Sequence, residues 1–279
     1  NLTRASLDAS CKYPWTREVG EERGTGKFGV YADDRAVFDW VRQGAPESQT
    51  SIEAQVMDLS DDIAYSVHDL EDAIVESFVS LPELDDPANR PAILFAASDW
   101  SGSKFTEEEL DEAFVRLQLQ PYWMREYDAS RQAQAGLKNL TSQLIGRFAK
   151  AATAATWAAQ PGESLIRYRA SLVVPREIRA EIALLKGIVA GFVMSLDARR
   201  PIYEHQRKIL VELAEMFWQT GDQHLDAAFA ADFRAADDDT ARKRVVVDQV
   251  ANLTDKGALV WHDRLAAASE VPSRVASWH

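Results

Sequence analysis

The chain has 279 residues, 46% of them hydrophobic and 27% charged, and a formal net charge of -13. This composition can supply a buried core, but it does not suit a protein that coats nucleic acid, which requires clustered lysine and arginine. The single cysteine, Cys11, excludes an internal disulfide. The acidic balance and the cysteine count lead us to expect a cytoplasmic protein, and because no apolar run reaches the roughly 18 residues of a membrane-spanning helix, we expect no membrane partner.

Helical periodicity dominates the chain, with proline and glycine at the breaks. Helices are predicted from the start to Lys12 and over residues 35–42, 51–79, 106–117, 130–158, 176–197, 203–219, 225–235, 238–253 and 256–268. Residues 81–105, rich in Pro, Asp and Ser, are predicted to form an irregular excursion, and residues 163–174 one short extended segment. The sequence therefore predicts an all-α fold, with residues 1–279 in a single helical unit.

The predicted helix over residues 51–79 has two different faces. At 100° per residue, the apolar face carries Ile52, Val56, Leu59, Ile63, Val67, Leu70 and Ile74, and the opposite face carries Asp58, Asp61, Tyr65, Asp69 and Asp72. Aspartates one turn apart repel each other by about 0.2–0.5 kcal/mol, so we expect a cation or hydroxyl groups opposite them. A solvated surface has the same spacing. The aromatic Tyr65 in the middle of the polar face favours a cleft.

Four segments carry recognisable motifs. They are Asn1 to Ala5 followed by Lys12-Tyr13-Pro14-Trp15, the loop Lys27-Phe28-Gly29-Val30-Tyr31, the helix Val56 to Ala73, and the segment Arg244 to Asp255. They resemble, in that order, the "NLTxA…KYP" segment, the "K-x-G-x-Y" loop, the last metal-ligand helix and the C-terminal helix of the HD-domain deoxynucleoside triphosphate triphosphohydrolases, the dGTPase-like family. The resemblance extends over nearly the whole chain and implies the HD-domain helical fold.

This resemblance implies hydrolysis of a dNTP to the deoxynucleoside and tripolyphosphate by a water that a divalent metal, such as Mg²⁺ or Mn²⁺, activates. In the family, a histidine, an adjacent His-Asp pair and a distal aspartate hold the metal, and only the distal aspartate has a counterpart here, Asp61. The pair His68-Asp69 lies within the acidic helix and does not match the family's His-Asp pair. We therefore expect the C-terminal portion of a longer enzyme, without a catalytic residue of its own and inactive alone.

Five residues are candidates for substrate binding. The resemblance implies that Tyr65 stacks on the deoxyribose and crowds its 2′ position, and that Asp69 accepts a hydrogen bond from the 3′-hydroxyl, although pairing with an arginine would also account for Asp69. Lys12 lies near a chain reversal and Lys27 in a glycine-rich loop, and both are candidates for the phosphates. A lysine in such a loop is ordinarily exposed. Arg125 is a candidate for the phosphates or the base; Arg131 competes for this role, and stacking on Trp123 would also explain Arg125.

The resemblance also implies partners. It implies a homo-oligomer, often a tetramer or hexamer in this family, and an allosteric nucleotide; single-stranded DNA is a further partner in the family, which the net charge of this chain does not support. Two alternatives stay open. The chain could be an HD phosphohydrolase acting on nucleoside monophosphates, which would need fewer lysines facing phosphate, or a non-catalytic helical oligomerisation or regulatory module.

Overall fold

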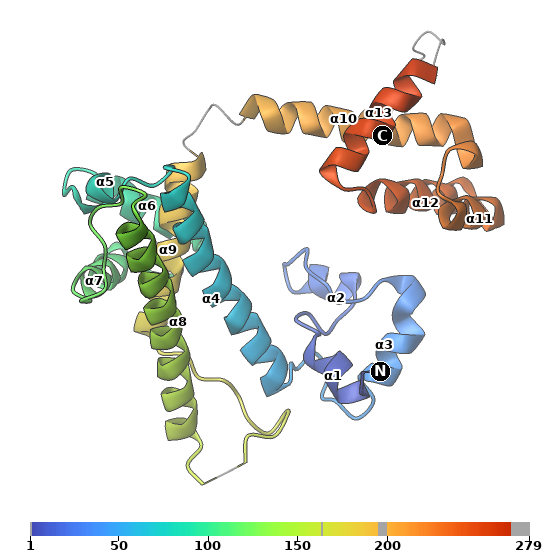
Figure 1. Cartoon of the computed structure of the whole chain (residues 1–279). Coiled ribbons are helices and arrows are strands. Elements are labelled where there is room, and N and C mark those ends of the chain that lie inside the picture. The colour runs from blue at the N-terminus through green and yellow to red at the C-terminus, as the bar shows by residue number, and fades with distance from the viewer. Residues whose placement is uncertain (1, 163, 195–199, 269–279) are drawn as a thin grey trace. The chain divides into compact units, whose positions relative to one another are not determined.

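The computed structural model describes residues 2–162, 164–194 and 200–268 (Figure 1). In these ranges every regular element is helical, which confirms the all-α prediction. The elements are α1 (Arg4–Ala9), α2 (Arg17–Glu22), η1 (Ala32–Asp34), α3 (Arg35–Val41), α4 (Ile52–Val75), α5 (Leu81–Asp85), α6 (Arg90–Trp100), α7 (Glu107–Gln118), α8 (Arg131–Ala159), α9 (Arg176–Met194), α10 (Arg200–Thr220), η3 (Gly221–Gln223), α11 (Ala227–Ala235), α12 (Asp239–Ala251) and α13 (Asp255–Ala268). None of these helices is both long enough and apolar enough to cross a membrane.

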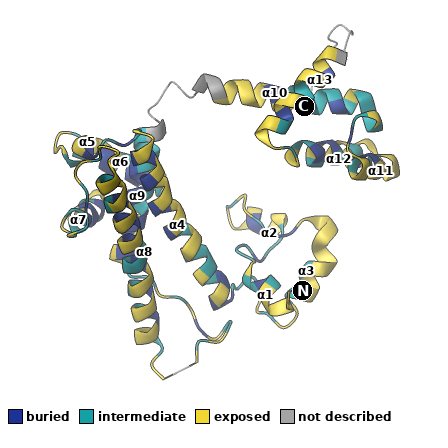
Figure 2. Cartoon of the chain, viewed as in Figure 1, coloured by how far each residue is buried: buried dark blue, intermediate teal, exposed yellow. Residues whose placement is uncertain are grey.

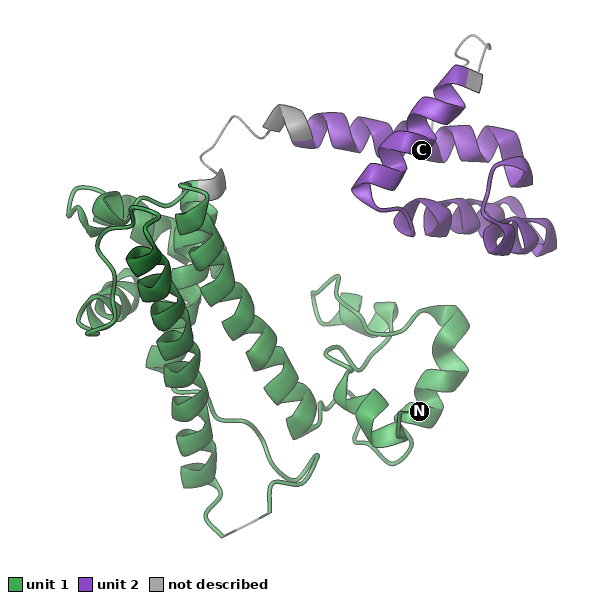
Figure 3. Cartoon of the chain, in the orientation of Figure 1, with its two compact units in different colours: residues 1–195 green, residues 196–279 purple. Residues whose placement is uncertain are grey.

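The chain forms two compact units, residues 1–195 and 196–279, rather than the single unit predicted from sequence (Figure 3). The physical reason is that each unit buries an apolar core of its own. Helices α4 to α9 contribute the first core, and α10 to α13 contribute the second. Hydrophobic periodicity identifies which face of a helix is buried but not which core receives it, so this division was not visible in the sequence.

In the first unit, α9 occupies the centre. It packs against α4, α6 and α7, and α8 packs on α4. The side chains of Phe114, Leu144, Phe148, Leu184 and Leu185 are fully buried between these helices. Figure 2 shows the buried residues gathered in α4 to α9, whereas α3 has none. The large core therefore fixes the direction of α4 and α9, the two helices that contribute most to the site described below.

Residues 81–105 were predicted to be irregular, but they contain helices α5 and α6. Both helices have proline in the first turn, where its missing N–H and fixed φ are tolerated. Helix α6 packs closely on α9, since a Cβ added at Gly187 would lie 2.2 Å from the Cα of Ala97. The prolines taken as breaks therefore begin helices, and this stretch belongs to the core.

Other boundaries differ by smaller amounts. Helix α4 begins at Ile52, and the side chain of Ser51 caps it by accepting a hydrogen bond from the N–H of Ala54. The helix buries most of its predicted apolar face, but Val56 is 47% exposed. Helix α1 ends at Ala9, so Lys12 lies beyond it in an irregular segment. The described part of the predicted extended segment, residues 164–174, contains a turn and no strand.

In the second unit, α10 packs against α12 and α13, and α11 packs against α12. Its core contains the fully buried Leu213, Phe217 and Val246, with the ring of Trp261 5.6 Å from that of Phe217. Asp238 begins α12 by accepting a hydrogen bond from the N–H of Ala241.

Candidate functional site

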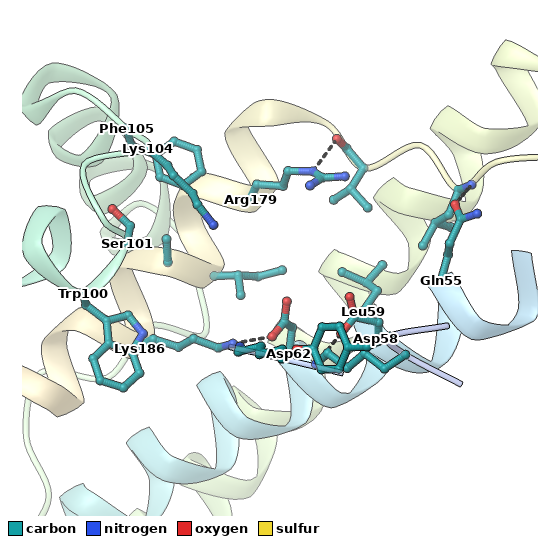
Figure 4. Close-up of a pocket in the computed structure, with 17 residues that line it drawn as sticks. Gln55, Asp58, Leu59, Asp62, Trp100, Ser101, Lys104, Phe105, Arg179 and Lys186 are labelled. Atoms are coloured by element: carbon teal, nitrogen blue, oxygen red, sulfur yellow. Dashed lines mark hydrogen bonds and ion pairs between the residues drawn. The ribbon is translucent and has the colours of Figure 1, made fainter. Parts of the chain in front are cut away.

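A cavity of about 600 Å³ lies in the first unit, beside α4 and α9 (Figure 4). Its lining comes from five parts of the chain and contains five cationic and two anionic side chains. The residues are Lys12, Tyr13, Lys27, Gln55, Asp58, Leu59, Asp62, Trp100, Ser101, Lys104, Phe105, Leu172, Val174, Arg179, Ile182, Ala183 and Lys186. The lining is thus net positive in a chain whose overall charge is -13, which favours an anionic ligand.

Two segments from the N-terminal part of the chain bring Lys12 and Lys27 together. Both ammonium groups lie over the ring of Tyr13, at 5.9 Å and 5.6 Å from its centroid. The indole of Trp15 donates to the carbonyl oxygen of Lys27 at 2.8 Å, and the N–H of Gly29 donates to the carbonyl of Trp15 at 3.1 Å. The two predicted phosphate candidates therefore share one wall, which backbone contacts hold in place.

Helix α4 forms the acidic side of the cavity, with Asp58 and Asp62 one turn apart. Lys12 pairs with Asp58, which raises the pKa of Lys12, and its Nζ also lies 3.5 Å from Asp61. From the other side, Lys186 of α9 donates to Asp62 at 2.5 Å (Figure 4). Both carboxylates that line the cavity are thus neutralised by lysines of the chain.

The wall opposite α4 consists of the loop after α6 and the first turns of α9. Trp100, Lys104 and Phe105 come from the end of α6 and this loop. From α9, Arg179, Ile182 and Lys186 recur at helical spacing and so face one side. Arg179 donates from Nε to the carbonyl of Val174 at 3.4 Å.

The other predicted site residues lie around or away from the cavity. Asp61 is not part of the lining, but its carboxylate lies 3.5 Å from the Nζ of Lys12, which is, and about half of its side chain is exposed. Tyr65 is 58% exposed and, like the exposed Asp69, is not part of the lining. The pKa of Asp69 is raised, first by loss of hydration and then by the negative charge of Asp72.

Arg125 does not line the cavity either. It pairs with Asp85 at 2.7 Å, and the same carboxylate accepts a hydrogen bond from Gln118 at 2.7 Å. Its position thus reflects a surface ion pair between the α5 region and the segment after α7. The cavity-facing arginine is Arg179.

The divalent metal that the resemblance implies does not fit the donors described. Within residues 2–162, 164–194 and 200–268, no group of three or more His, Cys, Asp or Glu side chains could hold a metal ion. Asp58 and Asp62 are paired with lysines, and Asp61 faces Lys12. A single shared carboxylate does not hold a divalent ion by itself, so the metal would need ligands from elsewhere.

Sequence reasoning did not find the wall of Lys104, Arg179 and Lys186. Lys186 alone gave a signal, because it interrupts the apolar run of α9. A charged residue in a buried helix face is normally paired or functional. The sequence pattern around Lys104 and Arg179 is that of ordinary solvent-exposed residues. Only the packing of α6 on α9 brings the two side chains to the same cavity.

The sequence comparisons agree with the motifs. A family model described as a phosphohydrolase-associated domain matches residues 172–264. A deoxyguanosinetriphosphate triphosphohydrolase-like protein of Streptomyces coelicolor is 48% identical over 268 residues, which cover 95% of this chain and 63% of the relative. Those of Bifidobacterium longum and Corynebacterium efficiens are 40% and 38% identical, over 95% and 91% of this chain and 57% and 60% of their own lengths.

The chain thus spans about three fifths of the length of the curated relatives that it matches. It is nevertheless similar to them along nearly all of its own residues, and its motif segments and all-α fold agree with that similarity. The chain is therefore a homologue of the deoxyguanosinetriphosphate triphosphohydrolase-like proteins, a phosphohydrolase family.

Proposed function

We propose that this chain supplies the phosphate- and sugar-facing part of a dNTP triphosphohydrolase. The observation that carries the proposal is the convergence of Lys12 and Lys27, from separate segments, on a net positive cavity beside the acidic face of α4. Phosphate oxygens attract lysine ammonium groups as point charges, and a cavity of about 600 Å³ is within the usual size of a small-molecule site. The names of the relatives support a guanine deoxynucleotide as substrate.

In the proposed reaction, water adds at the α-phosphorus of a dNTP and the bond to the 5′-oxygen breaks. The 5′-oxygen takes a proton and leaves as the deoxynucleoside, and the three phosphates leave together as tripolyphosphate. Lys12 and Lys27 would hold the phosphates in the cavity. Asp61, whose carboxylate faces Lys12, marks the point from which the sugar would extend along α4.

Tyr65 and Asp69 are proposed to contact the sugar. At a rise of 1.5 Å per residue, the helix from Asp61 to Asp69 extends about 12 Å, the order of the distance from the α-phosphate to the far side of the sugar. Their exposure leaves both side chains accessible to a ligand lying along this face. In this arrangement the ring of Tyr65 crowds the 2′ position, and the carboxylate of Asp69 accepts a hydrogen bond from the 3′-hydroxyl.

Because the described donors do not complete a metal site, we propose that the 279 residues alone do not release tripolyphosphate. The purified chain is incubated with dGTP and Mg²⁺ or Mn²⁺, and the products are separated by anion exchange. Release of tripolyphosphate above a no-protein control would overturn this part of the proposal. The same product analysis, on a protein extended to the full length of its relatives, should show deoxynucleoside and tripolyphosphate without free phosphate.

Binding separates the remaining alternatives. Calorimetry of the 279-residue chain with dGTP should show binding that Lys27→Ala weakens, with the exposed Lys150→Ala on α8 as the matched control. Loss of affinity for dGTP relative to GTP in Tyr65→Ala would support the sugar contact, and unchanged discrimination would refute it. A scaffold without a nucleotide site would bind neither nucleotide, and a monophosphatase site would be insensitive to Lys27→Ala.

A further inference from the structure

The wall of the cavity opposite α4 is unexplained by any motif in the sequence. The loop that follows α6 contains Trp100, Ser101 and Lys104, and the adjacent face of α9 contains Arg179. Figure 4 shows the side chains of Lys104 and Arg179 at the cavity, across from the ion pair of Lys186 and Asp62. Two cations thus point into a cavity whose acidic side is already neutralised.

The charges of this wall have no acidic counterpart in the described part of the chain. Lys12 pairs with Asp58 and Lys186 with Asp62, but no carboxylate lies within ion-pair distance of Lys104 or Arg179 there. Among the residues that the structure describes, Arg179 donates a hydrogen bond only from Nε, to Val174, so both terminal nitrogens of its guanidinium are available there. In a chain with 44 acidic and 31 basic residues, two cations left together without acidic partners favour an anionic ligand.

Arg176 holds this wall in a fixed position. Its guanidinium donates to the carbonyl oxygen of Lys104 at 3.0 Å, pairs with Glu109 at the start of α7, and lies 5.1 Å from the ring centroid of Phe105. Arg176 stands in the first turn of α9, three residues before Arg179. The loop with Lys104 is therefore fastened to the helix that carries Arg179, so the backbone at both positions is held before a ligand arrives, while both side chains are exposed.

We propose that Lys104 and Arg179 bind the distal phosphates of the triphosphate, and so make the site selective for nucleotides with more than one phosphate. This inference rests on the proposed function, in which Lys12 and Lys27 hold phosphates of the same ligand. A cavity of about 600 Å³ has room for a whole small ligand, much more than a single phosphate group. The guanidinium of Arg179 suits bidentate contact with phosphate oxygens, and the lysine adds a mobile point charge.

The experiment compares dGTP, dGMP and inorganic tripolyphosphate as ligands of the 279-residue chain, by isothermal titration calorimetry. Lys104→Ala and Arg179→Gln should each weaken dGTP and tripolyphosphate about tenfold or more, the order expected for one charge-assisted hydrogen bond, and leave dGMP unchanged. The matched control is Lys150→Ala, exposed on α8 and outside the cavity, and it should bind all three ligands as the unmodified chain does.

A third variant tests the placement of the wall. Arg176→Gln leaves every cavity cation in place but frees the loop, so it should lower the ratio of dGTP to dGMP affinity while circular dichroism shows an unchanged fold. If the ratio of dGTP to dGMP affinity is the same in all three variants as in the unmodified chain, the inference is overturned. The proposed function would still stand in that case if Lys27→Ala weakens dGTP binding. Two dGTP molecules per chain, with the first insensitive to Lys104 and Arg179, would also overturn the inference. A chain that binds neither dGTP nor tripolyphosphate would overturn both proposals.

Discussion

Substitution of Gly29 by alanine should displace the wall that carries Lys12 and Lys27. A Cβ at this position would lie 2.2 Å from the carbonyl oxygen of Tyr13, whereas ordinary van der Waals contact begins at 3.4 Å. The neighbour is backbone and cannot rotate away, so the two segments must separate by roughly 1 Å, at a cost of about 1–3 kcal/mol for overpacking. Misplacement of binding groups on this scale weakens ligand binding strongly, and we expect at least tenfold weaker binding of tripolyphosphate.

Gly26, in the same loop, is the matched control for this prediction. A Cβ there meets nothing within 4 Å, so Gly26→Ala should bind tripolyphosphate as the unmodified chain does. Both variants are measured by calorimetry, and far-ultraviolet circular dichroism checks that α4 to α9 stay folded. The reasoning fails if Gly29→Ala binds normally, or if Gly26→Ala is impaired to the same degree.

Three further predictions concern the stability of the fold. The hydrogen bond from Arg176 lowers the pKa of Glu109 to about 2. The ionised carboxylate therefore stabilises the fold fully above its ordinary pKa of 4.5, and this stabilisation is lost as the pH falls from 4.5 toward 2. Denaturant titrations should show that Glu109→Gln flattens the pH dependence of the free energy of unfolding in this interval. Glu181→Gln removes a fully buried charge that two partly exposed arginines contact, and urea unfolding should show a loss of about 1.5–3 kcal/mol, the order of a hydrogen bond to a charged group. Phe217→Ala should destabilise the core of residues 196–279 by about 3–5 kcal/mol. Below the unfolding transition of this variant, tripolyphosphate binding should be unchanged. Weakened binding in the still-folded variant would contradict the assignment of separate cores.

The two faces of α4 were predictable because helical period alone determines them. Ile63, Val67, Leu70 and Ile74 are buried as the pattern indicates. The position of Val56 was not predictable in this way, because periodicity says which residues share a face but not where the neighbouring helices end. The same limit explains why one helical unit was predicted where two cores exist.

Proline explains the largest error in the fold. In residues 81–105, Pro82 and Pro91 were taken to mark irregular backbone, yet both stand in the first turn of a helix. Proline forbids the helix interior but is favoured at its start, so its position relative to the cap decides its meaning. Ser80 does cap α5, by accepting a hydrogen bond from the N–H of Glu83, but a serine before a proline-containing segment is equally typical of a turn.

For the site, the sequence indicated single segments and the fold combined them. Lys12 and Lys27 were candidates through their motifs, and the structure places both at one cavity. Lys104 and Arg179 are 75 residues apart in the chain, and no local pattern relates them. Their proximity depends on the close packing of α6 against α9 and on the contacts of Arg176, which are tertiary.

The acidic row of α4 was predicted to have a cation or hydroxyl groups opposite it, and in the structure lysines of the chain face one end of the row. At one end, Lys12 reaches Asp58 and Asp61, and Lys186 reaches Asp62. At the other end the repulsion persists, since the charge of Asp72 contributes to the raised pKa of Asp69. The compensated end adjoins the cavity, whereas Asp69 lies on the exposed face. Because Lys12 and Lys186 neutralise the cavity carboxylates, the charges of Lys27, Lys104 and Arg179 remain to act on an anionic ligand, next to the ammonium group of Lys12 that shares a wall with Lys27.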